Sequence, residues 1–346
     1  MLYVTTRINR DAFTAHRALT EQRGPEGGLY LPMRMPKFSQ EQICGLGNRS
    51  FGENVADILN LLFNTRLSGW DVEFAVGRHS IKLVSLNSKA AVAETWHNPD
   101  WRFERMARNL CKAVRQTDED CKVTDWMMIA ARIAVLFGIF GELLRTGQVT
   151  MDAPIDVALP SGDFSAPMAA WYAREWGLPI RQIVCCCNEN SAPWSLLHQG
   201  DLRTDGVAVR TATPNCDQAV PADLERLVYS TLGYAQTKRY CEACRQGGTY
   251  HLEGKQLQKL RQGLYVSVVS QRRLESMIPN IYHSNGYIPD PYTALAYSGL
   301  IDYRSRTGEN RPALIVAEES PAFSLDTVAA CLGITPGELK DRINKS

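Results

Sequence analysis

The stretch LPSGDFSAP, residues 159–167, decides the fold of this chain. The apolar residues 157–159 that lead into it are typical of the end of a buried strand. Pro167 suits the first turn of a helix, where its missing N–H costs nothing, and Gly177 is placed to end that helix. The run Ile183–Cys187 then reads as a second buried strand. The sequence therefore predicts a strand, a tight turn, a helix and a strand, which together form one unit of a parallel sheet.

The turn inside this stretch is a candidate anion site. Ser161, Gly162 and Asp163 are small or turn-forming residues between a strand and a helix. At such a place, backbone N–H groups and the N-terminus of a helix can hold an anion. An ordinary strand-to-helix turn has the same appearance, and a motif this short does not separate the two interpretations.

The composition excludes several classes of partner. The 346 residues are 45% hydrophobic and 22% charged, which is typical of a soluble globular protein with two or three domains. Lys plus Arg is 38 and Asp plus Glu is 37, so we expect neither nucleic acid nor a charged membrane surface as a partner. The ten cysteines lack the spacing of a disulfide framework and the N-terminus lacks a signal-peptide core, so we expect a cytoplasmic protein.

The longest apolar run, residues 126–144, is predicted to be a buried helix. It contains Arg132 and Glu142, which would be costly inside a membrane. We therefore expect this run to lie in the core of the protein and not in a bilayer.

No metal site is predicted. Cys241, Cys244 and His251 have metal-like spacing, but a structural zinc needs four ligands and residues 234–245 read as a helix. The three cysteines 185–187 fall in a predicted buried strand, where cysteine acts as a small hydrophobic residue.

Taken together, several motifs resemble threonine synthase. Three motifs occur in the same order as in that family, where they read P-S/T-G-N-F-G, GLPI and NEN. Here they lie at residues 159–165, 177–180 and 188–190. In that family the loop cradles the phosphate of pyridoxal phosphate (PLP). Further similar motifs lie at residues 3–7, 27–32, 215–227, 286–294 and 312–323.

The resemblance implies an α/β fold of the tryptophan-synthase-β-like kind, PLP fold type II. We expect an N-terminal α+β domain over residues 1–85. A three-layer α/β/α large domain would follow over residues 86–346, with a mostly parallel sheet.

The position of the family's imine-forming lysine holds a glutamate. The family motif E-L-F-H-G-P-T-L-A-F-K-D is matched at four positions: Glu94, His97, Pro99 and Phe103. Its Lys corresponds to Glu104, and a carboxylate cannot form an imine with PLP. The Asp after the Lys corresponds to Arg105, which is expected to pair with one of the nearby acids.

The resemblance also implies a large internal gap. The family carries a small domain whose A-T-S-G-D-T-G loop binds the carboxylate of the substrate, and no such loop occurs in this chain. Only residues 116–123 separate the helix after Glu104 from the next similar block. A block on the order of 100 residues is thus expected to be missing between about 112 and 124.

The next block resembles the family helix N-S-I-N-W-A-R-I. The alignment keeps Arg132 but places Trp126 and Met127 where the family has its Asn-Ser pair. These three residues are the remnant of the substrate site that the resemblance implies. Arg132 is either part of that remnant or the partner of a buried acid, and the sequence leaves both open.

Four substitutions make the expected cofactor pocket acidic. Glu104 replaces Lys, Asp163 replaces the Asn of the loop, Glu318 replaces the Thr beside the pyridine nitrogen, and Glu319 replaces an Ala. A carboxylate at Asp163 would oppose a nearby phosphate by about 1 kcal/mol at high dielectric constant. The remnant cofactor-binding positions are Ser161, Gly162, Asp163, Phe164, Ser165 and Glu318.

The resulting hypothesis is a pseudoenzyme of the threonine synthase kind. We expect no catalytic residue, no bound PLP and no metal, and a pocket for a cationic small molecule or a basic side chain of a partner. Two alternatives stay open. One is a residual PLP-dependent lyase, acting on O-phosphohomoserine or a related substrate through Lys89 or Lys112. The other is a regulatory subunit of a full-length homologue, or a homo-oligomer.

Overall fold

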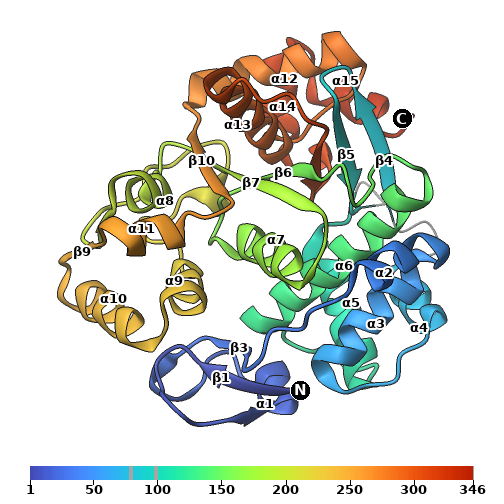
Figure 1. Ribbon diagram of the computed structural model, residues 1–346. Coiled ribbons are helices and arrows are strands. Elements are labelled where there is room, and N and C mark those ends of the chain that lie inside the picture. The colour runs from blue at the N-terminus through green and yellow to red at the C-terminus, as the bar shows by residue number, and fades with distance from the viewer. Residues whose placement is uncertain (78–80, 97–99, 346) are drawn as a thin grey trace.

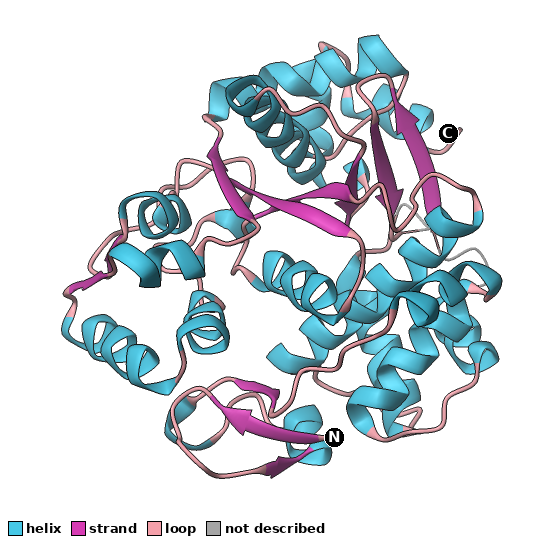
Figure 2. Ribbon diagram, in the orientation of Figure 1, coloured by secondary structure: helices cyan, strands magenta, loops and turns pink. Residues whose placement is uncertain are grey.

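The computed structural model describes residues 1–77, 81–96 and 100–345. His97 and Pro99, two positions of the predicted cofactor motif, therefore lie outside the described residues. The centre of the molecule is a six-stranded sheet with the strand order β10-β7-β6-β11-β5-β4 (Figures 1 and 2). All neighbouring strands in it run parallel except β4 and β5, so the sheet is mostly parallel, as predicted. Its strands are β4 (Lys82–Leu86), β5 (Ala90–Glu94), β6 (Ile155–Pro160), β7 (Ile180–Cys187), β10 (Leu264–Val268) and β11 (Ala313–Ala317).

Residues 159–167 and the elements on either side of them fold as predicted. β6 ends at Pro160, helix α7 spans Ser165–Trp176, and β7 pairs parallel with β6. Gly177 ends α7 with a φ of +123°, a backbone conformation that favours glycine. Asp163 thus lies in the loop between a buried strand and the N-terminus of a helix.

Successive residues of a strand pack alternately into two separate hydrophobic cores, one on each face of the sheet. On β6, Val157 and Leu159 pack with α5 (Phe103–Arg115), α6 (Asp125–Arg145) and α7. Ala158 packs on the opposite face, with α12 (Gln271–Asn285), α13 (Pro291–Thr307) and α14 (Leu325–Leu332). This period of two is what a parallel strand buried on both faces requires. The predicted three-layer arrangement is therefore present (Figure 1).

Helix α6 is the buried helix predicted from the apolar run. It is long and apolar enough to cross a membrane by length and composition alone, but most of it is buried inside the protein. Gly138 and Gly141 allow close packing, since a Cβ at either position would lie within 3 Å of Phe51 or Asn54 on the neighbouring helix α3 (Phe51–Phe63).

The N-terminal part contains a small sheet and four helices. The sheet has the order β2-β1-β3, with β1 (Leu2–Thr5), β2 (Phe13–Thr14) and β3 (Tyr30–Pro32). The helices are α1 (Ala15–Thr20), α2 (Gln40–Gly45), α3 and α4 (Gly69–Val76). The expected boundary at residue 85 falls inside β4, which pairs with β5 in the large sheet, and the division into domains stays a prediction.

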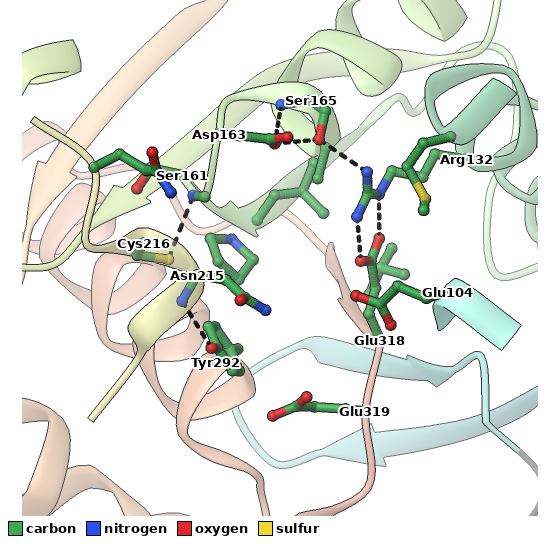
Figure 3. A pocket seen from close by; sticks show the side chains of 17 residues that line it. Glu104, Arg132, Ser161, Asp163, Ser165, Asn215, Cys216, Tyr292, Glu318 and Glu319 are labelled. Carbon is green, nitrogen blue, oxygen red and sulfur yellow. Dashed lines mark hydrogen bonds and ion pairs between the residues drawn. The ribbon is translucent and has the colours of Figure 1, made fainter. Parts of the chain in front are cut away.

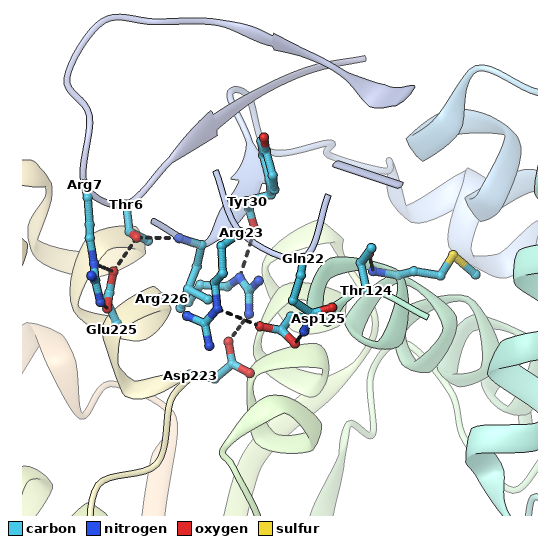
Figure 4. A network of polar contacts seen from close by, with 12 residues as sticks. Thr6, Arg7, Gln22, Arg23, Tyr30, Thr124, Asp125, Asp223, Glu225 and Arg226 are labelled. Carbon is cyan, nitrogen blue, oxygen red and sulfur yellow. Dashed lines mark hydrogen bonds and ion pairs between the residues drawn. The ribbon is translucent and has the colours of Figure 1, made fainter. Parts of the chain in front are cut away.

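A polar network joins this N-terminal part to the large sheet's helices (Figure 4). Arg7 donates two hydrogen bonds to the carboxylate of Glu225, at 3.0 and 2.8 Å. The fully buried Arg226 donates from Nε to the carbonyl of Tyr30 at 2.9 Å and pairs with Asp223. Both Glu225 and Arg226 lie in helix α9 (Leu224–Leu232), so β1 and β3 are held against this helix.

The remaining elements form a lobe beside β7 and β10. They are α8 (Ala192–Trp194), β8 (Asp201–Arg203), α10 (Tyr234–Gln246), β9 (Thr249–His251) and α11 (Gly254–Leu260), and α15 (Pro336–Ile343) closes the chain. Helix α10 contains Cys241 and Cys244, as the helical interpretation predicted. Within the described ranges, no group of three or more side chains is arranged to hold a metal ion.

The connection from α5 to α6 is short. Residues 116–124 hold neither helix nor strand. Gln116 ends α5 in the left-handed region with a φ of +51°, and the hydroxyl of Thr124 caps α6 by accepting from the N–H of Met127 at 3.1 Å. The two helices are therefore joined directly, as expected from the length of the sequence between them.

Candidate functional site

A cavity of about 280 Å³ lies beyond the carboxyl ends of β6 and β11 (Figure 3). Ligands of open α/β sheets bind at this edge, because the loops that follow the strands converge there. Its walls are formed by Glu104, Met128, Arg132, Leu159, Pro160, Ser161, Gly162, Asp163, Ser165, Ala166, Asn215, Cys216, Gln218, Tyr292, Val316, Glu318 and Glu319.

Most of the residues predicted for the site meet in this cavity. Glu104 reaches it from the first turn of α5, Arg132 from α6, and Glu318 from the segment after β11. The loop 161–165 forms another wall, except that Phe164 is fully buried beneath it.

Backbone donors of the loop are paired with other groups of the chain. The N–H of Phe164 donates to the carbonyl of Ser161 at 2.7 Å, and the N–H of Gly162 donates to Sγ of Cys216 at 3.3 Å. Gly162 and Phe164 both have positive φ values, +49° and +73°. Such conformations are strained for a residue like phenylalanine and are found at ligand-binding turns.

A carboxylate of the chain occupies the N-terminus of α7. Oδ1 of Asp163 accepts the N–H of Ser165 at 2.9 Å and also accepts the Ser165 hydroxyl. A negative group at this position is favoured by the helix dipole and by the unpaired N–H groups. Asp163 therefore supplies, from within the chain, the anion that such a turn otherwise takes from a ligand.

Arg132 combines the two roles that the sequence left open. Its guanidinium donates from Nε and one Nη to the two oxygens of Glu318, both at 2.7 Å, and from the other Nη to Oγ of Ser165 at 2.8 Å. Burial lowers the pKa of Arg132, but the Glu318 carboxylate outweighs burial and raises it overall. Arg132 is thus both a wall of the cavity and the partner of an acid.

Glu319 is the most strongly perturbed acid of the cavity. It is 7% exposed, and Nε of Arg102 lies 3.1 Å from its carboxylate. Burial raises the pKa of Glu319 to about 8, the carboxylate of Asp290 adds to this rise, and Arg102 opposes it. Arg105, which was expected to pair with an acid, lies over the ring of Trp101 at 4.1 Å, and it is Arg102 that pairs with Glu319.

Trp126 and Met127 do not reach the cavity; Met128 does. Trp126 packs edge-on against Tyr3 and Tyr172, and Met127 is fully buried in the core. Met128 and Arg132 are four residues apart in α6 and so share one helix face. This spacing was the signal in the sequence that could have identified Met128.

Four further wall residues come from distant parts of the chain: Asn215, Cys216, Gln218 and Tyr292. The hydroxyl of Tyr292 accepts the N–H of Asn215 at 3.1 Å. Burial raises the pKa of Cys216 to about 12, which keeps its thiol protonated at neutral pH.

The NEN motif supports this wall from behind. Asn188 donates to Oδ1 of Asp217 at 2.7 Å, and Asn190 donates to the same atom at 3.1 Å. Asp217 also accepts the N–H of Thr211 at 2.8 Å. The motif therefore fixes the turn that carries Asn215 and Cys216, and it does not itself line the cavity.

Comparison with known proteins agrees with this fold. The family profile "Threonine synthase N terminus" matches residues 2–77. Threonine synthase-like 1 of Pongo abelii is 28% identical over 177 residues, which are 50% of this chain and 24% of that protein. Threonine synthase of Methylobacillus glycogenes is 26% identical over 219 residues, which are 61% of this chain and 44% of that protein. The matched part thus spans about a quarter of the first relative and less than half of the second.

The fold comparison extends over the whole chain. The crystal structure of PLP-bound threonine synthase from Brucella melitensis superposes with a TM-score of 0.82 at 20% identity, covering 99% of this chain and 94% of that one. Residues 2–77 thus match the threonine synthase family, and the whole chain has the fold of a threonine synthase. Its fold is accordingly PLP fold type II, as the motifs indicated.

The residues of the cavity do not fit the cofactor of the threonine synthase family. Among the described residues that line it there is no lysine, and Glu104 faces the cavity. The N-terminus of α7, where an anionic phosphate would bind, already holds the carboxylate of Asp163. Glu318 is held in a bidentate pair with Arg132.

Proposed function

We propose that this chain is a threonine synthase-like protein that has lost PLP-dependent catalysis and binds a cationic ligand in the acidic cavity. The observation that carries the proposal is the Asp163 carboxylate, hydrogen-bonded to Ser165 at the N-terminus of α7. It provides the negative charge that the phosphate of PLP would bring, and it would repel that phosphate by about 1 kcal/mol or more. Glu104 is the second reason to propose a loss of catalysis, since a carboxylate cannot form an imine with PLP.

The charge of the walls supports a cationic ligand. Glu104, Asp163 and Glu318 face one cation of the wall, Arg132, which is already paired with Glu318. Glu319, whose pKa is raised to about 8, adds a further negative charge only above that pH. Walls of one sign focus the field within a cleft and attract ions of the opposite sign. A primary ammonium or guanidinium group, from a small molecule or a partner's side chain, is the matching chemistry.

We also propose that the direct joining of α5 to α6 reflects the loss of the family's small domain. The support is the connection 116–124, which is too short to hold a domain. Without that domain the chain lacks the loop with which the family binds the carboxylate of its substrate.

A titration with PLP tests the loss of catalysis. The purified chain is mixed with PLP, the absorption band of a protein imine is sought, and borohydride is added to trap any imine on a lysine. We expect no imine band and no labelled lysine. A band that borohydride abolishes, with label on Lys89 or Lys112, would instead favour the residual-lyase alternative.

Thermal unfolding with a diamine tests the cationic ligand. Putrescine is compared with 1,4-butanediol, which has the same length and no charge. We expect putrescine alone to raise the midpoint of wild-type unfolding, because ligand binding to the folded state stabilises it by mass action. The rise should shrink in the double variant Glu104→Gln/Asp163→Asn. Equal rises in wild type and double variant would place the binding elsewhere and contradict the proposal.

A further inference from the structure

A second hollow, remote from the candidate site, lies between α4, the end of α5 and the start of the α5–α6 connection. It measures about 570 Å³. We call it the α4–α5 groove. Its walls are Arg66, Leu67, Asp71, Phe74, Ala75, Asn109, Lys112, Ala113, Gln116, Thr117 and Asp118. Asn109 ties the two helices together by donating to the carbonyl of Ala75 at 2.8 Å.

Phe74 is a wall of the α4–α5 groove, and Trp70 lies one turn before it in α4. Phe74 is 94% exposed, the highest value among the large hydrophobic residues that the structure describes, and Trp70 is 69% exposed. They are four residues apart in α4, so they share one face of the helix. Figure 1 shows α4 at the periphery of the molecule, beside α3. An exposed aromatic pair beside an apolar hollow is typical of a protein–protein interface.

The α4–α5 groove carries both halves of a self-complementary contact. Phe74 is a projecting apolar group, and Leu67, Ala75 and Ala113 provide an apolar hollow beside it. In a two-fold dimer the same patch serves both chains, so each projecting group meets the hollow of the other chain.

The charges of the α4–α5 groove are balanced in the same way. Two cations, Arg66 and Lys112, and two anions, Asp71 and Asp118, belong to its walls. Two identical patches of mixed charge can face one another with opposite signs in contact, whereas a patch of one sign would repel its copy.

The available area is sufficient for a stable pair. An aromatic side chain buries about 150–250 Å², so two from each chain contribute about 600–1,000 Å². With the groove walls, the total reaches the roughly 1,000 Å² or more that a specific interface needs.

We propose that the α4–α5 groove is the interface of a homodimer of this chain, in which Phe74 of each copy inserts into the groove of the other. The interface does not include the candidate site, so the proposal stands apart from the proposed function. The occupant to which it commits is a second copy of this chain.

Sedimentation velocity of the full chain over a range of concentrations tests the homodimer. We expect a mass that doubles with rising concentration for the wild type. Phe74→Asp should raise the dissociation constant at least about tenfold, because an aromatic residue at the centre of an interface is a hot spot. Val207→Asp, at a residue that is 91% exposed in the lobe between β8 and α9, is the matched control and should leave the dimer intact. A wild type that stays monomeric, or a Phe74→Asp variant that still dimerises, would overturn the proposal.

A pair of charge reversals provides the second test and does not depend on Phe74. Arg66→Glu makes the groove net acidic and Asp118→Lys makes it net basic, so each variant alone should dimerise more weakly than the wild type. An equimolar mixture of the two should recover association, because acidic and basic grooves then meet. Failure of the mixture to recover, with both variants folded by circular dichroism, would show that a different protein or no partner covers the groove.

Discussion

At the scale of single residues, the replacements in the candidate site act by charge more than by size. Asp163 lies where a phosphate would bind, and its carboxylate takes the donors of Ser165. Glu104 replaces an amine at the first turn of α5. On the proposed function, each replacement exchanges a group that would favour PLP for one that repels it or cannot react with it. The cavity itself remains, because its apolar walls, such as Leu159 and Val316, are set by the strands.

Glu319 makes stability depend on pH. Its folded pKa is raised to about 8 from an ordinary value of 4.5. Folding therefore favours the protonated form of Glu319. The contribution of this protonation to the free energy of unfolding is fully present below about pH 4.5. It is lost as pH rises through 8, by up to about 1.4 kcal/mol per pH unit. Asp223 and Asp290, whose pKa values are raised to about 7 and about 6, act in the same direction.

We expect Glu319→Gln to flatten this dependence. The amide keeps the size of the side chain but cannot ionise, so the variant should lose less stability than wild type as pH rises toward 8. Urea unfolding at a series of pH values measures this, with the exposed Glu119→Gln as control. Parallel curves for Glu319→Gln and wild type would refute the assignment.

The prediction of site residues succeeded where a sequence motif determined the position of the side chain. It failed where tertiary packing determined that position. Glu104, Arg132 and Glu318 were placed by the family motifs and do face one cavity. The same alignment placed Trp126 in the site. Successive side chains of a helix point about 100° apart, so Trp126 and Met128 point in different directions, and it is Met128 that faces the cavity. Asn215 and Tyr292 come from segments far along the chain, and no local pattern predicts their meeting.

At the scale of elements, one ion pair connects three parts of the site. Arg132 on α6 holds Glu318 after β11 and the hydroxyl of Ser165 at the start of α7. The side chains are only 14% and 27% exposed, so either charge left alone would be poorly solvated. Removing one partner should therefore cost more than removing both.

We predict this asymmetry for the two single variants and their combination. Arg132→Met should destabilise the fold by about 2–4 kcal/mol, because it leaves the Glu318 carboxylate unpaired, and Glu318→Gln by somewhat less, because the amide oxygen can still accept a hydrogen bond from Arg132. Arg132→Met/Glu318→Gln should recover a good part of the loss. Denaturant unfolding of all four proteins gives the coupling free energy. Additive single effects would mean that the pair does not act as a unit.

Elements with a strong local pattern were the ones that could be predicted. The strand, turn and helix at 155–176 follow from apolar runs, small residues and Pro167. Helix α3 ends at Phe63, because Asn64 adopts a left-handed conformation with a φ of +56°. Asparagine tolerates that conformation, and this explains why the helix ends there. A hydrophobic pattern carries no information about it.

At the scale of the whole molecule, the sheet unites parts of the chain that are far apart. β11 lies between β6 and β5, so the last strand of the chain sits at the centre. The apolar runs and the family motifs predicted a mostly parallel, three-layer fold. The antiparallel β4 at the edge and the network that joins β1 and β3 to α9 depend on long-range pairing, which composition and periodicity do not reveal.

Restoring the lysine should not restore the reaction of the family. Glu104→Lys would place an amine at the first turn of α5, facing the cavity, while Asp163 would still occupy the N-terminus of α7. We expect at most weak imine formation at high PLP. Adding Asp163→Asn removes the opposing charge and should strengthen PLP binding about fivefold, as expected for roughly 1 kcal/mol of repulsion.

Neither variant should release threonine from O-phosphohomoserine. Proton transfers need a substrate held in one orientation, and the direct connection 116–124 supplies no loop to bind its carboxylate. The measurement is threonine formed by Glu104→Lys and by Glu104→Lys/Asp163→Asn, against wild type and a mixture without protein. Failure of both variants alongside stronger PLP binding by the second would separate cofactor binding from turnover. Threonine above the background would show that the proposed missing domain is dispensable, and the proposed loss of function would then rest on Glu104 and Asp163 alone.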